Sequence, residues 1–144
     1  MLGEYANNNY GIDFNSGQAD TFSLIRNMPL LATNASICDT TGQLLFYTNG
    51  IYVANRNHDT LVNSPGFNPG YFTNHYHTVG IGIYQGALVI PSPGEKTKYY
   101  IFHESAEGIV IDTQAAGHPV NLAYSKVDMT LDGGLGVVVQ KNSI

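Results

Sequence analysis

Two histidines separated by one tyrosine are the residues whose spacing most suggests chemistry in this sequence. His75 and His77 flank Tyr76 in a segment rich in Asn, Gly, Pro and aromatic residues. In an extended chain, residues two apart point to the same side, so both imidazoles could bind one metal ion, with His103 or Glu104 as a third ligand. A two-histidine pattern without a suitably spaced carboxylate is nevertheless common by chance. We therefore interpret these residues as polar loop residues and expect no metal site.

The acidic residues show no recognisable catalytic or calcium-binding pattern. Asp13, Glu104 and Asp112 are conceivable partners for glycoside hydrolysis, but that reaction requires two carboxyl groups at a set separation. Asp39 lies three residues before Gly42, and Asp132 lies directly before Gly133. Because Asp does not recur at alternate positions, these two residues and Asp59 are interpreted as turn residues and not as calcium ligands. Phosphate-binding glycine motifs and the Gly-x-Ser-x-Gly motif are absent from the sequence. We expect no catalytic residues and no cofactor.

Aromatic residues in the histidine-containing segment indicate a binding surface instead. Aromatic side chains on a loop can stack on sugar rings or peptide side chains, and loops on rigid scaffolds often carry function. The candidate ligand surface comprises Tyr71, Phe72, His75, Tyr76, His77 and His103. Aromatic residues of the expected strands, such as Tyr47, Tyr99 and Tyr100, are predicted to pack between sheets.

Composition excludes several classes of partner. Charged residues make up 12% of the 144 residues, about half of the ~25% that is usual for globular domains. The net charge of −5 argues against a nucleic-acid partner, which requires a basic surface, and against docking on an anionic membrane. No apolar run approaches the roughly 20 residues that cross a bilayer, so membrane insertion is not expected.

The single cysteine, Cys38, excludes a disulfide within the chain. Its short apolar segment predicts a small, buried side chain. A nucleophilic role would require a partner base, and no known local signature of such a site surrounds it.

Strand-forming and turn-forming residues alternate at short intervals, which is typical of an all-β protein with tight hairpins. Residues 34–63 predict a four-stranded antiparallel meander, with strands at 35–38, 43–48, 51–55 and 60–62. Within it, Asn49-Gly50 predicts a type I′ hairpin turn, because both residue types tolerate positive φ. A second meander is predicted over residues 86–141, with strands at 87–90, 98–103, 121–129 and 136–141. The segment 104–119 would be an insertion containing an extra hairpin.

The two meanders share an order of apolar strand, glycine-containing turn and aromatic strand, which predicts about two β-propeller blades. The chain would be a single all-β domain (1–144), with a first blade and N-terminal strand at about 1–63, a structured loop at 64–85 and a second blade at 86–144. A self-contained β-sandwich is the alternative. Propellers need four to eight blades, so two blades imply either the remaining blades of a longer parent chain or self-association.

Several strings in the chain resemble one group of large secreted Bacteroidetes proteins. These strings are GIDFNSG (11–17), ASICDTTGQLLFYTNGIYVANRNHDTL (35–61), QGALVIPSPG (85–94), KYYIFHES (98–105) and YSKVDMTLDGGLGVVVQKN (124–142). Members of the group begin with a β-propeller and end in a type IX secretion sorting domain or a gliding-motility-associated C-terminal domain. The resemblance implies a secreted or cell-surface propeller that acts as a scaffold or binds a glycan or protein. It carries no catalytic motif, and a propeller-type hydrolase or lyase is the alternative function.

Overall fold

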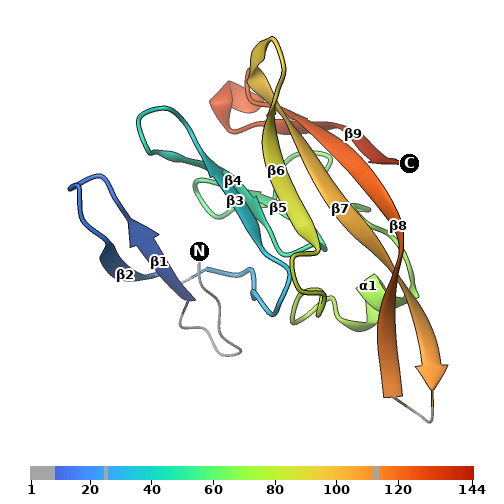
Figure 1. Ribbon diagram of the computed structural model, residues 1–144. Helices are drawn as coiled ribbons and strands as arrows, with labels where there is room; N and C mark the ends of the chain where they lie inside the picture. The colour runs from blue at the N-terminus through green and yellow to red at the C-terminus, as the bar shows by residue number, and fades with distance from the viewer. Residues whose placement is uncertain (1–8, 25, 112–113) are drawn as a thin grey trace.

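Antiparallel β-sheet makes up almost all of the regular structure in this computed structural model (Figure 1). The structure describes residues 9–24, 26–111 and 114–144. A two-stranded hairpin comes first, formed by β1 (Asn9–Asp13) and β2 (Asp20–Leu24). A three-stranded sheet follows, formed by β3 (Ala35–Cys38), β4 (Leu44–Thr48) and β5 (Val53–Asn55). The last sheet contains β6 (Ala87–Ser92), β7 (Glu95–Ile111), β8 (Gln114–Asp128) and β9 (Val137–Ser143).

Strand order within each sheet follows the order along the chain, and the strands paired within the described residues are all antiparallel. The predicted all-β class is therefore confirmed. The predicted strand 35–38 coincides with β3, and the predicted strands at 43–48, 87–90 and 136–141 overlap β4, β6 and β9. The β1–β2 hairpin was not predicted as a pair of strands.

The longest hairpin is formed by β7 and β8, whose pairing runs from Lys98↔Asp128 to Ile111↔Gln114. The segment 104–119 is thus not an insertion with its own hairpin, because it continues the same two strands. Figure 1 shows this extension projecting beyond β6 and β9. A β-bulge between Ser105 and Ala106 marks where the extension leaves the four-stranded sheet, which fits the tendency of bulges to bend a strand.

The β3–β5 sheet, which we call the first sheet, has three strands, and two isolated bridges replace the predicted fourth strand at 60–62. Thr60 bridges antiparallel to Ala54, while Val62 bridges parallel to Val137 of β9. The backbone N–H of Val138 donates to the carbonyl of Val62 at 3.1 Å. The segment 60–62 therefore connects the first sheet to the edge of the second.

Asn49 and Gly50 form the predicted connection between β4 and β5, but not as a type I′ turn. That turn needs positive φ at both residues, and only Gly50 has it (φ 83°). The fully buried Asn49 instead accepts hydrogen bonds through Oδ1 from the N–H groups of Ile51 (3.0 Å) and Tyr52 (3.4 Å). Its Nδ2 donates to the carbonyl of Pro29 at 3.0 Å. This long-range contact outweighs the local turn preference.

The segment 64–85, which the sequence predicts to be a loop, contains one short helix, α1 (Tyr71–His75). The helix is held by its contacts with the body of the protein. Phe72 is 4% exposed, and the Thr73 hydroxyl donates to the carbonyl of Asn68 at 2.6 Å. In the described part of the chain, no helix has the length and apolar character needed to cross a bilayer.

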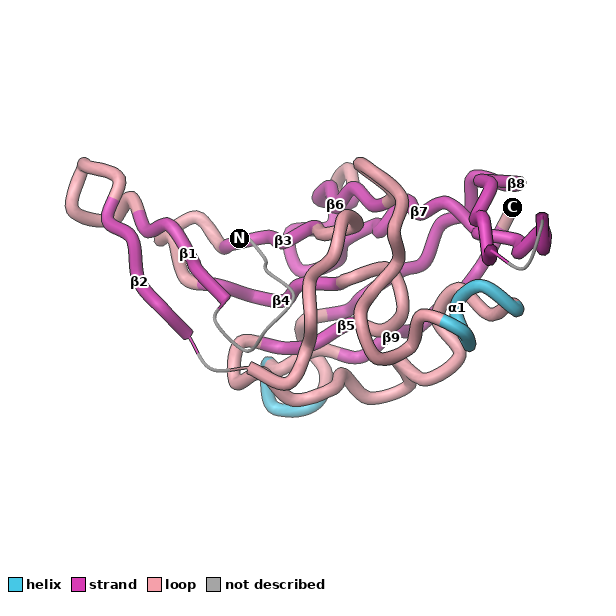
Figure 2. Tube along the Cα trace, turned by 90° about the horizontal axis from the view of Figure 1, so that it is seen from below, coloured by secondary structure: helices cyan, strands magenta, loops and turns pink. Residues whose placement is uncertain are grey.

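One hydrophobic core lies between the three-stranded and four-stranded sheets. Its buried members are Leu45, Phe46, Val53, Leu61, Phe67, Val89, Tyr99, Ile101, Val127, Met129 and Val138. Phe46 from the first sheet meets Tyr99 from the second edge to face, with ring centroids 5.6 Å apart. Because both sheets supply this core, neither buries its inner face alone. Figure 2 shows β3–β9 gathered in one body and the β1–β2 hairpin at one end of it.

Candidate functional site

The predicted ligand surface is divided between two places. Five of its residues lie on α1 and the turn that follows: Tyr71, Phe72, His75, Tyr76 and His77. The sixth, His103, lies in β7 and is 1% exposed. Its ring packs on Phe67, with centroids 4.3 Å apart, so His103 belongs to the interior and not to the exposed surface.

His75 ends α1 and His77 lies in the turn that follows, whereas the metal hypothesis assumed an extended segment. The alternation of an extended chain therefore does not place the two imidazoles on one side. His75 stacks on Tyr71 (centroids 6.0 Å apart), and His77 Nδ1 lies 2.7 Å from the carbonyl of Asn74. Among the residues that the structure describes, no three His, Cys, Asp or Glu side chains are grouped to hold a metal ion.

Of the predicted surface residues on α1, Tyr71 and His75 are exposed to solvent. Tyr71 is 52% exposed, but Phe72 is buried and packs on Tyr76 with ring centroids 4.4 Å apart. Phe72 also belongs to a small buried cluster with Ile81. The stacked pair Tyr71–His75 therefore remains as the exposed aromatic feature of α1.

The acidic residues occupy separate structural positions. Asp39 Oδ1 accepts hydrogen bonds from the N–H and hydroxyl of Thr41 and from the N–H of Gln43, as expected of a turn residue. Asp132 begins the turn η1 (Asp132–Gly134), with φ 51°. Asp13 accepts the N–H of Asn15 at 2.8 Å. The third carboxylate of the hydrolase hypothesis, Asp112, lies outside the described residues.

A cavity of about 180 Å³ lies beside His103, and we call it the His103 cavity. Its lining is formed by Asn68, Pro69, His103, Ser105, Asn121, Ala123, Asn142 and Ile144. Two features of the sheet explain the space. Small residues, Ala87 and Ala123, stand opposite His103 on the flanking strands. Bulges after Ser105 in β7 and between Tyr124 and Lys126 in β8 disturb the strand pairing nearby.

Two asparagines with left-handed backbones shape the cavity. Asn68 has φ 51° and Asn142 has φ 54°, a region that Asn tolerates better than most residues. The Asn68 N–H donates to Oδ1 of Asn142 at 2.9 Å. The Asn68 Nδ2 donates to the carbonyls of Glu104 (2.9 Å) and Gly50 (3.2 Å), which uses both of its hydrogens. Oδ1 of Asn68 is then left as a buried acceptor without a protein donor.

His103 carries a second buried side-chain atom without a hydrogen-bond partner, Nδ1. Ser125 Oγ accepts the N–H of Asn142 at 3.1 Å, and it lies 3.0 Å from Nε2 of His103. The serine hydroxyl can donate to Nε2 or accept from it, because a hydroxyl oxygen has two lone pairs and can accept from Asn142 and from His103 together. Nδ1 has no protein partner, and burial lowers the pKa of His103 to about 4. A buried polar group without a partner costs about 1–3 kcal/mol, so Oδ1 of Asn68 and Nδ1 of His103 each reduce the stability of the fold.

The outer surface of the four-stranded sheet is apolar and was missed as a site by the sequence reasoning. Its members, which we call the aromatic face, are Leu88, Ile90, Tyr100, Phe102, Leu122 and Tyr124. Leu88 is 59% exposed and Leu122 is 65% exposed. Tyr100 lies 5.6 Å from Tyr124 and 6.1 Å from Phe102 between ring centroids.

Alternation along β7 and β8 explains which residues reach this face. Tyr99 is 8% exposed and packs in the core as predicted, but the adjacent Tyr100 points to the opposite side of the strand. Tyr100 therefore does not pack between the two sheets of this chain, and its packing against a further blade stays a prediction. Leu122, Tyr124 and Lys126 occupy alternate positions of β8 and so lie on the same side of the strand. This alternation is the feature of the sequence from which the aromatic face could have been predicted.

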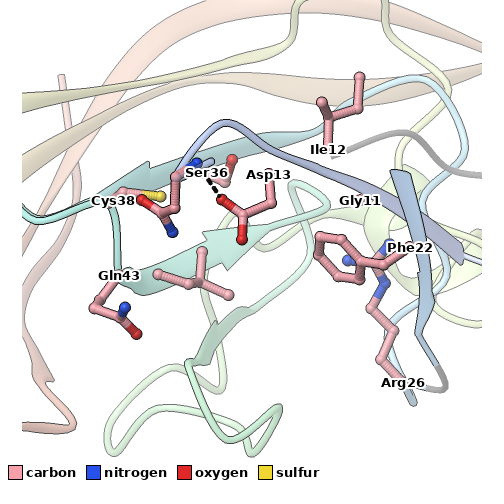
Figure 3. A pocket seen from close by; sticks show the side chains of 11 residues that line it. Gly11, Ile12, Asp13, Phe22, Arg26, Ser36, Cys38 and Gln43 are labelled. Atoms are coloured by element: carbon pink, nitrogen blue, oxygen red, sulfur yellow. Dashed lines mark hydrogen bonds between the residues drawn. The ribbon is translucent and has the colours of Figure 1, made fainter. Parts of the chain in front are cut away.

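A second hollow, of about 250 Å³, lies between the β1–β2 hairpin and the β3–β4 hairpin (Figure 3). Its polar lining includes Asp13, Arg26 and Gln43. Arg26 is 5% exposed and lies over the ring of Tyr47, 5.6 Å from its centroid. Burial lowers the pKa of Arg26. The carboxylate of Asp13 accepts a backbone N–H, and the guanidinium of Arg26 lies over the Tyr47 ring, so both charged groups have contacts within the protein.

Cys38 also lines this hollow, and its side chain is exposed, which contradicts the predicted buried side chain. The residue lies in β3, whose residues alternate between half-buried and exposed positions. Partial burial raises the pKa of the thiol, and the neighbouring Asp39 raises it further.

Comparisons with known proteins were made at three levels. No protein-family model matches the chain, and no match was found among curated proteins or among solved structures. The function is therefore proposed from the geometry of the chain itself.

Proposed function

We propose that this chain is a non-enzymatic module of β-propeller type, in which the two meander sheets are neighbouring blades. The observation that carries the proposal is that the four-stranded sheet is apolar on both of its faces. Its inner face contributes Val89, Ile101 and Val127 to the core, and its outer surface is the aromatic face. In a self-contained β-sandwich the outward residues are polar, whereas a propeller blade is covered on both sides. The aromatic face therefore favours a blade over the alternative β-sandwich.

The proposed cover of the aromatic face is another β-sheet, packed as the first sheet packs on the inner face. That sheet would come from the remaining blades of a longer parent chain or, for the purified chain, from a second copy. Burial of Leu88 and Leu122, which are 59% and 65% exposed, would contribute about 1–2 kcal/mol each, because complete burial of a leucine is worth about 1.5–3 kcal/mol. Exposed apolar surface of this kind usually marks an interaction site.

The module would serve as a scaffold or as a glycan- or protein-binding unit, secreted or at the cell surface, as the resemblance implies. The exposed stacked pair Tyr71–His75 on α1 supports the binding role, because an exposed ring on a loop can stack on a ligand. The negative net charge gives no support for a nucleic-acid partner.

The oligomeric state of the purified chain tests this proposal. Light scattering during gel filtration should show self-association of the wild-type chain and a monomer for Leu122→Glu, which places a charge on the aromatic face. Leu131→Glu is the matched control, because Leu131 is exposed in the turn after β8 and should leave association unchanged. A wild-type monomer with a single cooperative melt would favour the self-contained β-sandwich and overturn the proposal.

A further inference from the structure

We infer that the aromatic face of this chain binds the aromatic face of a second copy, in a closed dimer with a two-fold axis. The blade proposal, on which this rests, requires a β-sheet over that face. The covering sheet is here the same four-stranded sheet of another molecule, and the two sheets run in opposite directions. The contact is isologous, which means that both copies use the same surface.

The first sheet is covered on both of its faces, which limits how copies of the chain can stack. Its inner face contributes Phe46 to the core that it shares with the four-stranded sheet. On the opposite side of β4, Tyr47 is buried with Met28 and Leu30, which belong to the segment 26–31. In the described part of the chain, the first sheet therefore offers no open apolar face, whereas the four-stranded sheet does.

Head-to-tail stacking of copies would place the aromatic face of one molecule on the outer side of the first sheet of the next. The segment 26–31 occupies that side and is held there by two contacts. The guanidinium of Arg26 lies 5.6 Å from the centroid of the Tyr47 ring, and Nδ2 of Asn49 donates to the carbonyl of Pro29 at 3.0 Å. Because this segment would have to leave the sheet first, the isologous contact is favoured over the head-to-tail one.

The β1–β2 hairpin is another apolar surface that could cover the aromatic face. Tyr10 and Ile12 lie on one side of β1 and are 45% and 39% exposed. Since neighbouring strands are about 4.8 Å apart, two strands span about half the width of four. The hairpin would thus leave part of the aromatic face in water, whereas a second four-stranded sheet covers its full width.

The two ends of the aromatic face differ, and this difference sets the orientation of the two copies. A hollow of about 320 Å³ lies at the end that carries Glu104, and its lining includes Leu88 and Leu122. Tyr100 lies toward the other end, with Nζ of Lys126 4.8 Å from its ring centroid. When the strand direction is reversed, Tyr100 of each copy faces the hollow of the other, and each Lys126 lies toward the partner's acidic end. A parallel arrangement would bring the two ammonium groups together, which like-charge repulsion disfavours.

The area of the face sets the expected affinity. The outer strands β6 and β9 contain six and seven residues. The four strands therefore overlap over about 20 Å and span about 19 Å in width. The projected area is ~400 Å² per copy, about half of the ~800 Å² that each partner contributes to a standard interface. We therefore expect a weak, concentration-dependent dimer with a Kd of about 10 µM.

Sedimentation equilibrium of the full chain between about 1 and 300 µM tests the size of the assembly. The mass should rise from one copy to two and then stop, because an isologous contact closes the assembly. Tyr100→Ala should weaken the dimer about tenfold, since it removes a ring from the contact. Tyr71→Ala is the matched control, because Tyr71 is exposed on α1 and outside the aromatic face. Asn27→Glu, at an exposed position of the segment 26–31, should also leave the dimer unchanged.

Nuclear magnetic resonance tests the orientation in the wild-type chain, without any substitution. In a mixture of ¹³C-labelled and unlabelled copies, filtered nuclear Overhauser effects report only contacts between molecules. The Leu122 methyl groups of labelled copies should show such effects to the Tyr100 ring of unlabelled copies. Effects to the Tyr10 ring would show instead that the β1–β2 hairpin is the partner surface.

Four results would overturn the two-fold dimer. The mass would rise beyond two copies, Tyr100→Ala would associate as tightly as the wild type, Asn27→Glu would dissociate the assembly, or Leu122 would contact Tyr10 of the other molecule. Each of these would leave the blade proposal intact, because the chain would still self-associate. A wild-type chain that remains a monomer at about 300 µM would overturn both.

Discussion

Nε2 of His103 in β7 lies 3.0 Å from Oγ of Ser125 in the adjacent strand β8. The same hydroxyl accepts the backbone N–H of Asn142, so one serine connects three strands of the sheet. Burial of the imidazole against Phe67 favours its uncharged form. The His103–Ser125 pair thus makes the interior of the sheet sensitive to acid.

The pH dependence of stability follows from this burial. The pKa of His103 is lowered from 6.5 to about 4, so as the pH falls below 6.5 the unfolded chain takes up the proton first. Stability from this residue is therefore complete above pH 6.5 and falls until about pH 4, by about 3 kcal/mol in total. Urea unfolding between pH 7 and pH 4 should show this loss in the wild type and not in His103→Gln. Parallel pH profiles for the two proteins would contradict it.

The sequence predicted correctly the strand and the turn that are determined by neighbouring residues. The strand 35–38 and the turn at Asp39 follow from strand-forming residues and from an aspartate that bonds its own backbone, and both are observed. The type I′ turn at Asn49 was wrong because the contact of its side chain with Pro29, distant in sequence, decides the conformation. Likewise, the segment 60–62 bonds to β9, and no local pattern encodes that pairing.

The candidate sites were harder to predict for the same reason. Aromatic spacing on α1 gave no indication that Phe72 is buried beneath Tyr76, because the segment was read as extended. His103 was selected as a candidate, but its burial and its place beside Asn68 in the lining of one cavity arise only through tertiary structure. Alternation along β8 separates the residues of the aromatic face from those of the core. The sequence alone does not show which of the two sides the three-stranded sheet covers.

The shared core predicts that the two sheets unfold together. Phe46 is fully buried and packs on Tyr99, so Phe46→Ala should destabilise the chain by about 3–5 kcal/mol through the lost contacts and the resulting cavity. Hydrogen exchange should show reduced protection in β4 and β7 alike. Phe14→Ala is the control, since Phe14 is 67% exposed and its loss should change stability by less than about 0.5 kcal/mol. Loss of protection confined to the first sheet would argue against a common core.

Asn49 should contribute more to stability than its position in a connection suggests. Removal of its amide by Asn49→Ala leaves the N–H groups of Ile51 and Tyr52 and the carbonyl of Pro29 without this partner. We expect a loss of about 2 kcal/mol in the free energy of unfolding, measured by urea titration. Asn57→Ala, at an exposed turn position, should cost less than about 0.5 kcal/mol. Equal effects of the two substitutions would show that the buried amide is unimportant.

Glu95, at the turn between β6 and β7, should titrate at an unusually low pH. The Lys98 ammonium donates to Oε1 at 2.6 Å, and the Ser92 hydroxyl and the Lys126 ammonium donate to Oε2 at 2.9 Å and 3.3 Å. These donors favour the carboxylate and lower its pKa from 4.5 to about 2.

The stabilising effect of this carboxylate is therefore complete above pH 4.5 and is lost as the pH falls through about 2. Carbon NMR of the Glu95 carboxyl should show the low midpoint in the wild type. In Lys126→Ala the midpoint should rise but stay below 4.5, because Lys98 remains in contact. Lys96→Ala should leave it unchanged, since Lys96 is exposed and is not among the groups that lower this pKa. A wild-type midpoint near 4.5 would show that the ion pairs at this turn do not persist in solution.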